Sequence, residues 1–357
     1  MKVVVTGTRG IPNIMGGVET HCEELCPRLA ALGADITVVR RESYAKDSLT
    51  EWNGVKIKDI PSPRKKAFEA IVHTWRAINY AAREKADTVH INAVGPALLT
   101  PYAKLRGLKV VFTHHGPDYD REKWGRVAKA MLRLGERMGV KYADDVIVIS
   151  DVIRGIIEQK YGRTSRVHLI PNGVPAPNIC DFPEYFSELG IEPGKYILGM
   201  CRFVPEKRLH DLVEAFRSAP AGYKLVLAGD ADFEDDYSSR LKSDARAAGA
   251  VLTGFIRGRK LQALLSHAAL YVLPSSHEGL PIALLEAMSY GRKVLVSDIP
   301  ANLEVGLPAA NYFRCGDVSD LSVKLQQRLS DPAQPVYDMT KYDWDRIARQ
   351  VFEVYEH

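Results

Sequence analysis

Apolar runs rich in β-branched residues alternate with amphipathic stretches in the first half of the chain. Several of these runs are apolar throughout, which is typical of parallel strands that helices cover on both faces. One amphipathic stretch, residues 18–32, has helical spacing and places its apolar side chains on one face. The alternation indicates βαβ units in a doubly wound sheet. The predicted strands are residues 2–6, 35–39, 55–60, 88–91, 109–113, 145–149 and 168–170.

The pattern breaks at residues 171–177, Pro-Asn-Gly-Val-Pro-Ala-Pro, a composition typical of a linker. It then restarts and ends in a helix over residues 344–356 with one apolar stripe. We therefore predict an α/β protein with two Rossmann-like domains, residues 1–172 and 173–342, facing each other across a cleft. Ligands of such sheets bind at the carboxyl ends of the strands. The later predicted strands are residues 196–200, 224–228, 251–253, 270–273 and 293–296.

The length agrees with two domains, and the cysteine content indicates the cellular compartment. A chain of 357 residues is long for one core, since domains typically hold about 100–200 residues. The start of the chain has no signal-peptide pattern, and no apolar run approaches the length of a membrane span. Five scattered cysteines lack framework spacing, which favours free thiols in a reducing compartment. We expect a cytoplasmic protein.

The first loop, residues 7–19, follows a strand and opens a helix. Gly16 and Gly17 place backbone without side chains at the helix N-terminus, where free N–H groups attract phosphate. The alternative is an ordinary tight turn between strand and helix. The loop does not fit Gly-x-Gly-x-x-Gly, so a dinucleotide site has little support.

Cationic and imidazole side chains follow two other predicted strands. His114 and His115 end the strand of residues 109–113, where either one could face a ligand or be structural. Arg202 and Lys207 follow the strand of residues 196–200. The forked guanidinium of Arg202 and the ammonium group of Lys207 would together bind a diphosphate. The alternative is that the two are solvated surface charges, as such a pair often is.

Residues 276–288, Ser-His-Glu-Gly-Leu-Pro-Ile-Ala-Leu-Leu-Glu-Ala-Met, carry the sharpest signal. Glu278 lies in a loop before a helix that Pro281 begins. Glu286 lies within that helix between apolar neighbours, so it needs a partner wherever it is buried, and ribose or sugar hydroxyls are natural donors. The amides of Gly279 and Leu280 would meet phosphate at the helix start.

A metal site has little support. Residues 118–120 and 230–232 each read Asp-x-Asp, a loose pattern of metal–diphosphate sites that is too short to be specific. The histidine pair has no further ligands at zinc spacing. We expect neither a metal ion nor another cofactor.

Taken together, these motifs resemble the retaining family 4 glycosyltransferases of the GT-B fold. The resemblance rests on Gly16-Gly17, on Arg202 with Lys207, and on Glu278 with Glu286. It covers essentially the whole chain, including the last helix, about residues 343–357, which in that fold packs back on the N-terminal domain. The start of the chain is similar to enzymes that build bacterial surface polysaccharides, including rhamnosyltransferases.

The resemblance implies a hexosyl- or deoxyhexosyltransferase that moves a sugar from a nucleotide-diphosphate sugar to a glycan or a lipid-linked acceptor. By this resemblance, Arg202 and Lys207 would bind the diphosphate, Glu278 would contact the donor sugar, and Glu286 would hold the ribose. His115, which precedes Gly116, matches the family's active-site histidine, while the neighbouring His114 leaves that choice open. Further donor contacts are implied for Gly16, Gly17, Phe255, Ile256, Gly279, Leu280 and Pro281.

The charge of the two halves points to a surface partner. The net charge is +9 through Asn172 and −5 from Gly173 onward. Two predicted amphipathic helices of the first half, residues 64–85 and 121–141, are rich in Lys and Arg. We expect the N-terminal domain to associate with the anionic inner face of the cell membrane. Nucleic acid is disfavoured, because no aromatic or helix-turn-helix platform accompanies the charge.

Two other functions share these features. A nucleotide-sugar epimerase of the same fold would bind the same donor but transfer nothing to an acceptor. A non-catalytic sugar-nucleotide-binding protein would keep the fold, although the joint presence of Arg202, Lys207, Glu278 and Glu286 argues against it.

Overall fold

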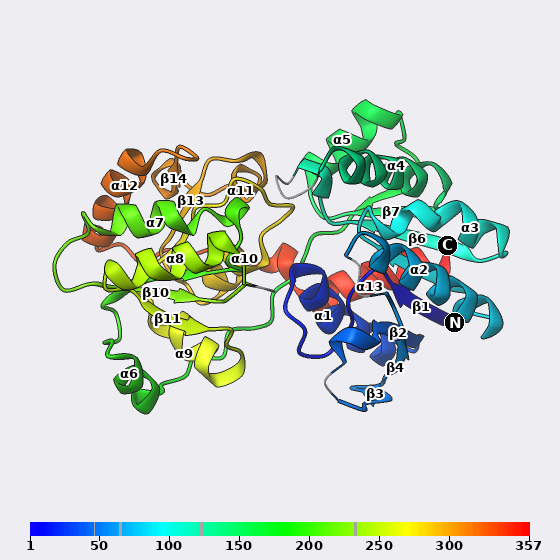
Figure 1. The fold of residues 1–357 in the computed structure, drawn as a ribbon, viewed down its shortest axis with the longest axis horizontal. Helices are drawn as coiled ribbons and strands as arrows, with labels where there is room; N and C mark the ends of the chain where they lie inside the picture. The colour runs from blue at the N-terminus through cyan, green and yellow to red at the C-terminus, as the bar shows by residue number, and fades with distance from the viewer. Residues whose placement is uncertain (46, 64–65, 121–124, 232–233) are drawn as a thin grey trace. The chain divides into compact units, whose positions relative to one another are not determined.

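The computed structural model describes residues 1–45, 47–63, 66–120, 125–231 and 234–357. The chain divides into an N-terminal unit, Met1–Gly173 with Lys341–His357, and a C-terminal unit, Val174–Thr340. Each unit is a largely parallel sheet covered by helices (Figure 1), so the predicted α/β class with two parallel-sheet domains is confirmed. The chain passes from one unit to the other after Gly173 and returns after Thr340.

The N-terminal unit is built on a sheet with strand order β3-β4-β2-β1-β5-β6-β7-β8 in the described residues. All neighbours are parallel except the short β3, which pairs antiparallel with β4. The strands are β1 Lys2–Thr6, β2 Asp35–Arg41, β3 Glu51–Trp52, β4 Val55–Ile60, β5 Thr88–Asn92, β6 Lys109–His114, β7 Asp145–Val148 and β8 Val167–Leu169.

Helices pack on both faces of this sheet (Figure 1). Alternate residues of β1 and β2 share one apolar cluster with α1 and α13. On the opposite face α4 approaches closely, because Gly139 has no Cβ that would meet the Phe112 ring. The helices are α1 Gly17–Ala31, α2 Lys66–Arg83, α3 Thr100–Leu105, α4 Arg126–Tyr142, α5 Asp151–Tyr161 and α13 Trp344–Glu356, with short 3-10 turns η1 Glu42–Tyr44, η2 Pro96–Leu99, η3 Asp118–Asp120 and η6 Thr340–Tyr342.

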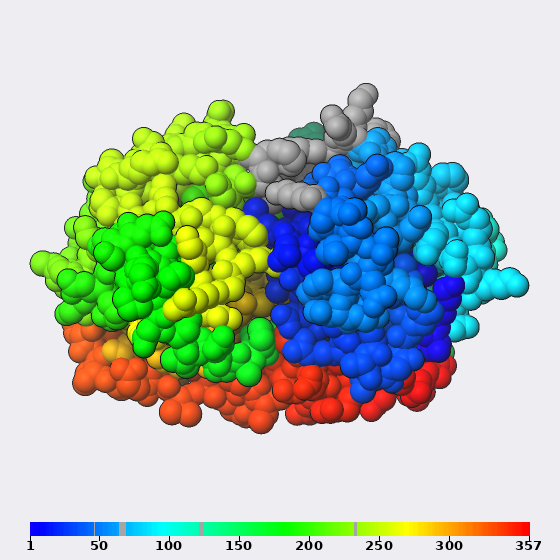
Figure 2. Space-filling model, turned by 90° about the horizontal axis from the view of Figure 1, so that it is seen from below, coloured from blue at the N-terminus to red at the C-terminus, as the bar shows by residue number. Residues whose placement is uncertain are grey.

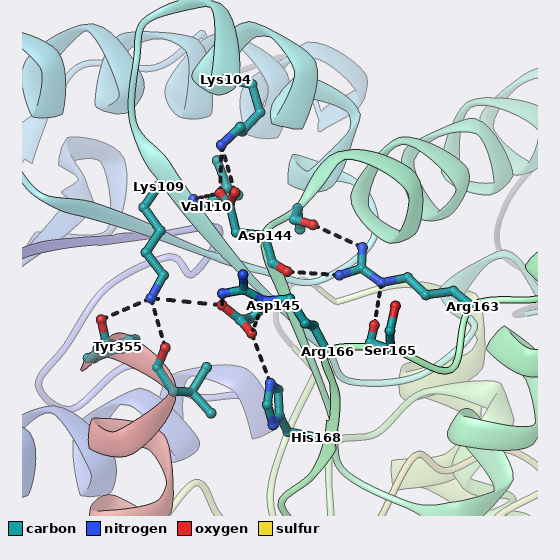
Figure 3. Close-up of polar contacts among 12 residues, drawn as sticks. Lys104, Lys109, Val110, Asp144, Asp145, Arg163, Ser165, Arg166, His168 and Tyr355 are labelled. Carbon is teal, nitrogen blue, oxygen red and sulfur yellow. Dashed lines mark hydrogen bonds and ion pairs between the residues drawn. The ribbon is translucent and has the colours of Figure 1, made fainter. Parts of the chain in front are cut away.

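The last helix, α13, is an integral part of the N-terminal unit. Its buried stripe lies against α1, and Figure 2 shows the red C-terminal residues against the blue N-terminal ones. At its end, Lys109 Nζ donates to the carbonyls of Val354 and Tyr355 at 2.9 Å (Figure 3). The same ammonium group lies 3.8 Å from the buried Asp145 carboxylate, which also pairs with Arg166 at 2.7 Å. A cation at a helix C-terminus satisfies carbonyls that the helix itself leaves open.

The C-terminal unit repeats the plan with strand order β11-β10-β9-β12-β13-β14, all parallel in its described residues. Its strands are β9 Tyr196–Met200, β10 Lys224–Ala228, β11 Val251–Gly254, β12 Leu270–Leu273, β13 Val294–Ser297 and β14 Tyr312–Phe313. Its helices are α6 Pro183–Leu189, α7 Leu209–Phe216, α8 Asp236–Ala247, α9 Gly258–His267, α10 Ile282–Ser289, α11 Pro300–Leu303 and α12 Val318–Ser330, with turns η4 Pro205–Lys207 and η5 Ala309–Asn311.

The structure adds to the sequence prediction at the sheet edges. The two-residue strands β3 and β14 were not predicted, because two residues are too few to show an alternation. The predicted basic helices start at residues 64 and 121, and their first residues, 64–65 and 121–124, lie outside the described part of the chain. In that described part no helix is both long and apolar enough to cross a bilayer.

Candidate donor and acceptor sites

Two loops of the C-terminal unit meet at the carboxyl edge of its sheet. One follows β9 and carries Arg202 and Lys207; the other follows β12 and carries Glu278. Because β9 and β12 are parallel neighbours, both loops leave the same edge. Lys207 Nζ lies 2.5 Å from Glu278 Oε1, with 17% and 9% of the two side chains exposed. The two predicted site residues therefore form a largely buried ion pair.

The two loops are also joined through their backbone. Ser276 donates from its amide and its hydroxyl to the carbonyl oxygen of Glu206, at 2.9 and 3.2 Å. Between them lies Cys201, whose thiol pKa is raised to about 12 by burial, with smaller effects from the charges of Lys207, Glu278 and Arg202. Cys201 directly follows β9, so it lies at the start of the loop that carries Arg202 and Lys207.

Helix α10 begins just after this ion pair. Pro281 is its N-cap, so Gly279, Leu280 and Pro281 form the approach to its N-terminus, where free amides favour an anion. Glu286 lies one and a half turns further along and is half-buried. Burial raises the pKa of the Tyr271 hydroxyl on β12, and the nearby groups Cys201, Glu278 and Glu286 raise it further.

Phe255 and Ile256 follow β11, at the same edge of the sheet. β11 lies two strands from β9, a separation of about 10 Å for strands about 4.8 Å apart. The Phe255 ring is 45% exposed and has the Arg257 guanidinium 5.3 Å from its centroid. An exposed aromatic ring at this distance from the cations suits the planar base of a nucleotide whose phosphates reach Lys207.

In the N-terminal unit the glycine loop packs around a buried carboxylate. Glu19 Oε1 accepts from Thr8 Oγ1 at 3.3 Å and from the Arg9 amide at 3.0 Å. Gly16 has a φ of 148°, and a Cβ there would lie 2.0 Å from Glu19 Oε2. A Cβ on Gly17 would meet no described atom within 4 Å. Gly16 is therefore needed by the fold, whereas Gly17 leaves the helix start open to a ligand.

The structure separates the roles of the two histidines after β6. His114 is fully buried; its Nδ1 accepts from the Gly116 amide at 3.1 Å, and its Nε2 lies 2.8 Å from Glu136 Oε1. Burial tends to raise the pKa of the Glu136 carboxyl, but hydrogen bonds from His114, Tyr161 and Tyr119 outweigh this and lower it to about 2. Both ring nitrogens of His114 are occupied, so its role is structural.

His115 is only half-buried and lies beside the glycine loop. Its Nε2 donates to Asn92 Oδ1 at 2.8 Å, which leaves Nδ1 as an acceptor. Burial lowers the pKa of His115 well below its usual range, so the ring is neutral at pH 7. Its edge contacts the ring of His21 on α1, with centroids 4.8 Å apart. The geometry therefore favours His115 over His114 as the histidine that a ligand meets.

His21, Asn92, Asn172 and Glu206 are site components that the sequence analysis missed. His21 Nδ1 lies 3.0 Å from Asn172 Oδ1, across 151 positions of sequence. Its ring also contacts Trp344 of α13 at 5.5 Å between centroids. No local motif marks these residues, since their partners lie in distant elements. Among these residues, only Asn92 carried a local signal, as a polar residue at the end of the apolar strand β5.

The described residues contain no group of three or more His, Cys, Asp or Glu side chains arranged to hold a metal ion. In the first Asp-x-Asp pattern, Asp118 and Asp120 lie in the short turn η3. In the second, Asp230 pairs with Lys242 at 2.8 Å, and Asp232 lies outside the described residues.

Sequence comparison assigns both halves of this chain. The Glycosyltransferase Family 4 profile matches residues 15–176, and the Glycosyl transferases group 1 profile matches residues 181–344. The second match spans both loops around the Lys207–Glu278 pair, and the first begins within the glycine loop, just before Gly16. The chain belongs to the family 4 glycosyltransferases, and it is an enzyme of that class.

Named relatives agree with this assignment. The chain is 24% identical to a glycogen synthase of Mycobacterium tuberculosis over 397 aligned positions, covering 99% of this chain and 94% of that protein. It is 28% identical over 235 positions to the UDP-Gal:alpha-D-GlcNAc-diphosphoundecaprenol alpha-1,3-galactosyltransferase of Escherichia coli, covering 62% of this chain and 60% of that one.

Solved structures show the same fold. The sucrose-phosphate synthase of Thermosynechococcus elongatus superposes with a TM-score of 0.84 at 20% identity, over 99% of this chain and 98% of that chain. Anabaena Alr3699/HepE, solved in complex with UDP-glucose, gives a TM-score of 0.76 at 19% identity, over 99% and 96%. The two-domain architecture is that of GT-B glycosyltransferases.

The two glycines of the first loop allow a matched pair of substitutions. We expect Gly16→Ala to destabilise the N-terminal unit by about 1–3 kcal/mol, because the residue is held at an unfavourable φ against Glu19. Gly17→Ala should leave the free energy of unfolding within about 1 kcal/mol of the wild type. Urea unfolding of both variants measures the difference, and equal stabilities would contradict the assigned roles.

The free energy of unfolding of the N-terminal unit should decrease as the pH becomes mildly acidic. Burial lowers the pKa of His21 and His73 to about 4 and of His90 to about 3. Unfolded histidines titrate near 6.5, so between about pH 6.5 and 4 the unfolded chain binds more protons than the folded one. The stabilisation is complete above pH 6.5 and is lost as the pH falls, with a slope approaching about 1.4 kcal/mol per pH unit for each histidine.

Tryptophan fluorescence measures this effect in one unit, because all four tryptophans belong to the N-terminal unit. Urea midpoints at pH 7.5, 6.0 and 5.0 should fall progressively, and His90→Gln should make the dependence shallower. A midpoint that is constant across this range would refute the neutral, buried state of these histidines.

Proposed function

We propose that this enzyme transfers a sugar from a nucleoside-diphosphate sugar to a hydroxyl of a glycan or lipid-linked acceptor, with retention of anomeric configuration. The observation that carries the proposal is the cation-rich edge of the C-terminal sheet. There the Lys207–Glu278 pair and the start of α10 lie together, and Glu286 follows on the same helix. This arrangement offers positive charge to a diphosphate and carboxylate oxygens to hydroxyl groups.

Each group has a role in binding the donor. Arg202, Lys207 and the amides at the start of α10 receive the diphosphate, where positive charge and free N–H groups converge. Glu278 accepts from a hydroxyl of the donor sugar, and Glu286 accepts from the ribose. Phe255 and Ile256 lie where the base would extend from the ribose. The UDP-glucose bound by Anabaena Alr3699/HepE supports a uridine or related nucleotide donor.

The chemistry then requires no protein nucleophile. The bond between the anomeric carbon and the β-phosphate oxygen breaks, and its electron pair leaves with the nucleoside diphosphate. The acceptor oxygen bonds to the same face of an oxocarbenium-like carbon and gives its proton to the departing phosphate. Lys207 and Arg202 stabilise the negative charge that grows on that phosphate, so they accelerate bond cleavage rather than binding alone.

This scheme also makes a metal ion unnecessary. In metal-dependent transfer a divalent cation neutralises the diphosphate. Here two cationic side chains and the N-terminus of α10 supply the same positive potential. We therefore propose metal-independent transfer, with the nucleotide sugar as substrate and no cofactor.

The acceptor would bind beside the glycine loop in the N-terminal unit. Gly17 leaves the start of α1 open, and His115 presents its Nδ1 acceptor close to that loop. A lipid-linked acceptor in bacterial cell-surface polysaccharide synthesis fits this proposal, since the similar Escherichia coli enzyme is named for a diphosphoundecaprenol-linked substrate.

A lipid-linked acceptor would bring the N-terminal unit to a membrane surface, and α4 offers a suitable face. Arg126, Arg133, Arg137 and Lys141 of α4 are exposed, as are Val127 and Leu134. The only acidic residue of α4, Glu136, points inward and holds His114 next to the proposed acceptor site. We propose that this helix rests on anionic lipid at the cytoplasmic face of the membrane.

Two substitutions test the donor site. Lys207→Ala should lower kcat about 100-fold, because the leaving phosphate loses a stabilising charge. Glu286→Ala should reduce kcat/KM for the donor by about tenfold or more, because a charge-assisted hydrogen bond to the ribose is lost. Radiolabelled transfer from UDP-, GDP- and dTDP-sugars to a lipid-linked acceptor measures both effects, with and without EDTA.

Lys324→Ala on α12 is the matched control and should leave transfer unchanged, and thermal melting should show all three variants folded. Turnover like that of the wild type in both site variants would contradict the assignment. Turnover of the donor without any transfer to the acceptor would instead favour an epimerase.

The membrane proposal has its own test. We expect co-sedimentation with vesicles containing phosphatidylglycerol, decreasing with salt, and none with pure phosphatidylcholine. Arg126→Ser with Arg137→Ser should weaken binding roughly 30-fold, at about 1 kcal/mol for each lost charge. Arg240→Ser with Arg246→Ser, on the exposed side of α8, removes the same charge as a control. Equal loss in both double variants would refute a specific role of α4.

A further inference from the structure

A pocket of about 380 Å³ lies in the C-terminal unit at the edge of the sheet where the strands begin. Its walls include Gly194 before β9, Tyr223 before β10, Ala269 before β12 and Lys293 before β13. The proposed donor site lies beyond the other ends of the same strands. A five-residue strand such as β9 spans about 16 Å, so the pocket and the donor site are distinct.

The pocket is cationic. Arg292 and Lys293 both line it, together with His267. Arg292 is half-buried, and its Nε donates to the Tyr290 carbonyl at 2.9 Å. Burial lowers the pKa of its guanidinium, and no carboxylate of the described residues forms an ion pair with it. A desolvated guanidinium that lacks an acidic partner is well suited to an external anion.

The acidic residues nearby are already engaged. Lys293 Nζ donates to the backbone carbonyl of Asp331, whose carboxylate pairs with Arg328 at 2.6 Å. His267 Nε2 lies 2.7 Å from Asp181 Oδ1, and that carboxylate is 80% exposed. The positive charge of Arg292 is therefore the least compensated of the charges that line the pocket.

Neutral donors complete the lining. Tyr223 and the exposed Gln334 also line the pocket, and the Lys195 ammonium group lies 5.5 Å from the centroid of the Tyr223 ring. The volume falls within the range of small-molecule sites, roughly 300–1,000 Å³. It leaves room for a polyol as well as an anionic group.

We infer that this pocket binds a small phosphate ester, with Arg292 and Lys293 receiving the phosphate and Tyr223 and Gln334 donating to oxygens of the attached group. A phosphate matches the forked geometry of a guanidinium. Because no carboxylate in the part of the chain that the structure describes lines the pocket, the Arg292 guanidinium is available for it.

The position of Arg292 connects this site to the donor site through one helix. Arg292 follows the C-cap of α10 by two residues, and its amide donates to the Ala287 carbonyl at 3.0 Å. Tyr290, whose carbonyl accepts from Arg292 Nε, donates from its own amide to the Glu286 carbonyl at 3.2 Å. An anion bound to Arg292 would therefore lie near the C-terminus of α10, while the N-terminus of the same helix forms part of the proposed donor site.

Calorimetric titration tests the inference, with mannose 6-phosphate, inorganic phosphate and free mannose as probes. Saturating UDP is present throughout, so that the donor site is blocked. We expect one mannose 6-phosphate per chain. Arg292→Gln should weaken its binding at least tenfold, and Gln334→Glu should do the same by placing a negative charge at the exposed rim.

Arg240→Gln on α8 is the control and should bind like the wild type. Equal affinity for inorganic phosphate would contradict the contacts assigned to Tyr223 and Gln334. Absence of binding to the wild type, or full binding by both pocket variants, would overturn the inference. Because Arg292 and Gln334 line this pocket and not the proposed donor site, a loss of binding in their variants supports the pocket even if the proposed transfer reaction is wrong.

Discussion

The ion pair between Lys207 and Glu278 is the interaction on which the proposed donor site depends. Removing two charges from water costs several kcal/mol for each ion, and only close geometry with further hydrogen bonds offsets that cost. The pair is 2.5 Å long and largely buried, and the Glu206 carbonyl joins the two loops that carry it. The parallel pairing of β9 and β12 fixes both loops at one edge. Glu278 thus holds the Lys207 ammonium group at the edge of the sheet where the donor is proposed to bind.

In the N-terminal unit, a set of contacts from distant elements holds His115 in place. The imidazole is oriented by Asn92 at the end of β5 and contacts His21 on α1, which is held in turn by Asn172. Trp344 packs against His21 from α13, so the last helix of the chain supports the acceptor side of the proposed site. Lys109 secures the far end of that helix. A defect in α13 would therefore disturb His115 as well as the hydrophobic core.

The sequence predicts the parts of this structure that depend on local pattern. Continuous apolar runs identified the parallel strands, and loops after β1, β9 and β12 were identified by glycine, cations and paired glutamates. Contacts across long stretches of chain left no such signal: His21 with Asn172, and Ser276 with Glu206. The choice between His114 and His115 also required the structure, because it depends on which side chain meets Glu136 on α4.

A crystal structure of the protein with a bound nucleoside diphosphate would test the central claim most directly. We expect phosphate oxygens within hydrogen-bond distance of Lys207 Nζ and the Arg202 guanidinium, ribose hydroxyls in contact with Glu286, and no metal ion bridging the phosphates. A diphosphate held through a divalent cation, or bound away from the ends of β9 and β12, would contradict it.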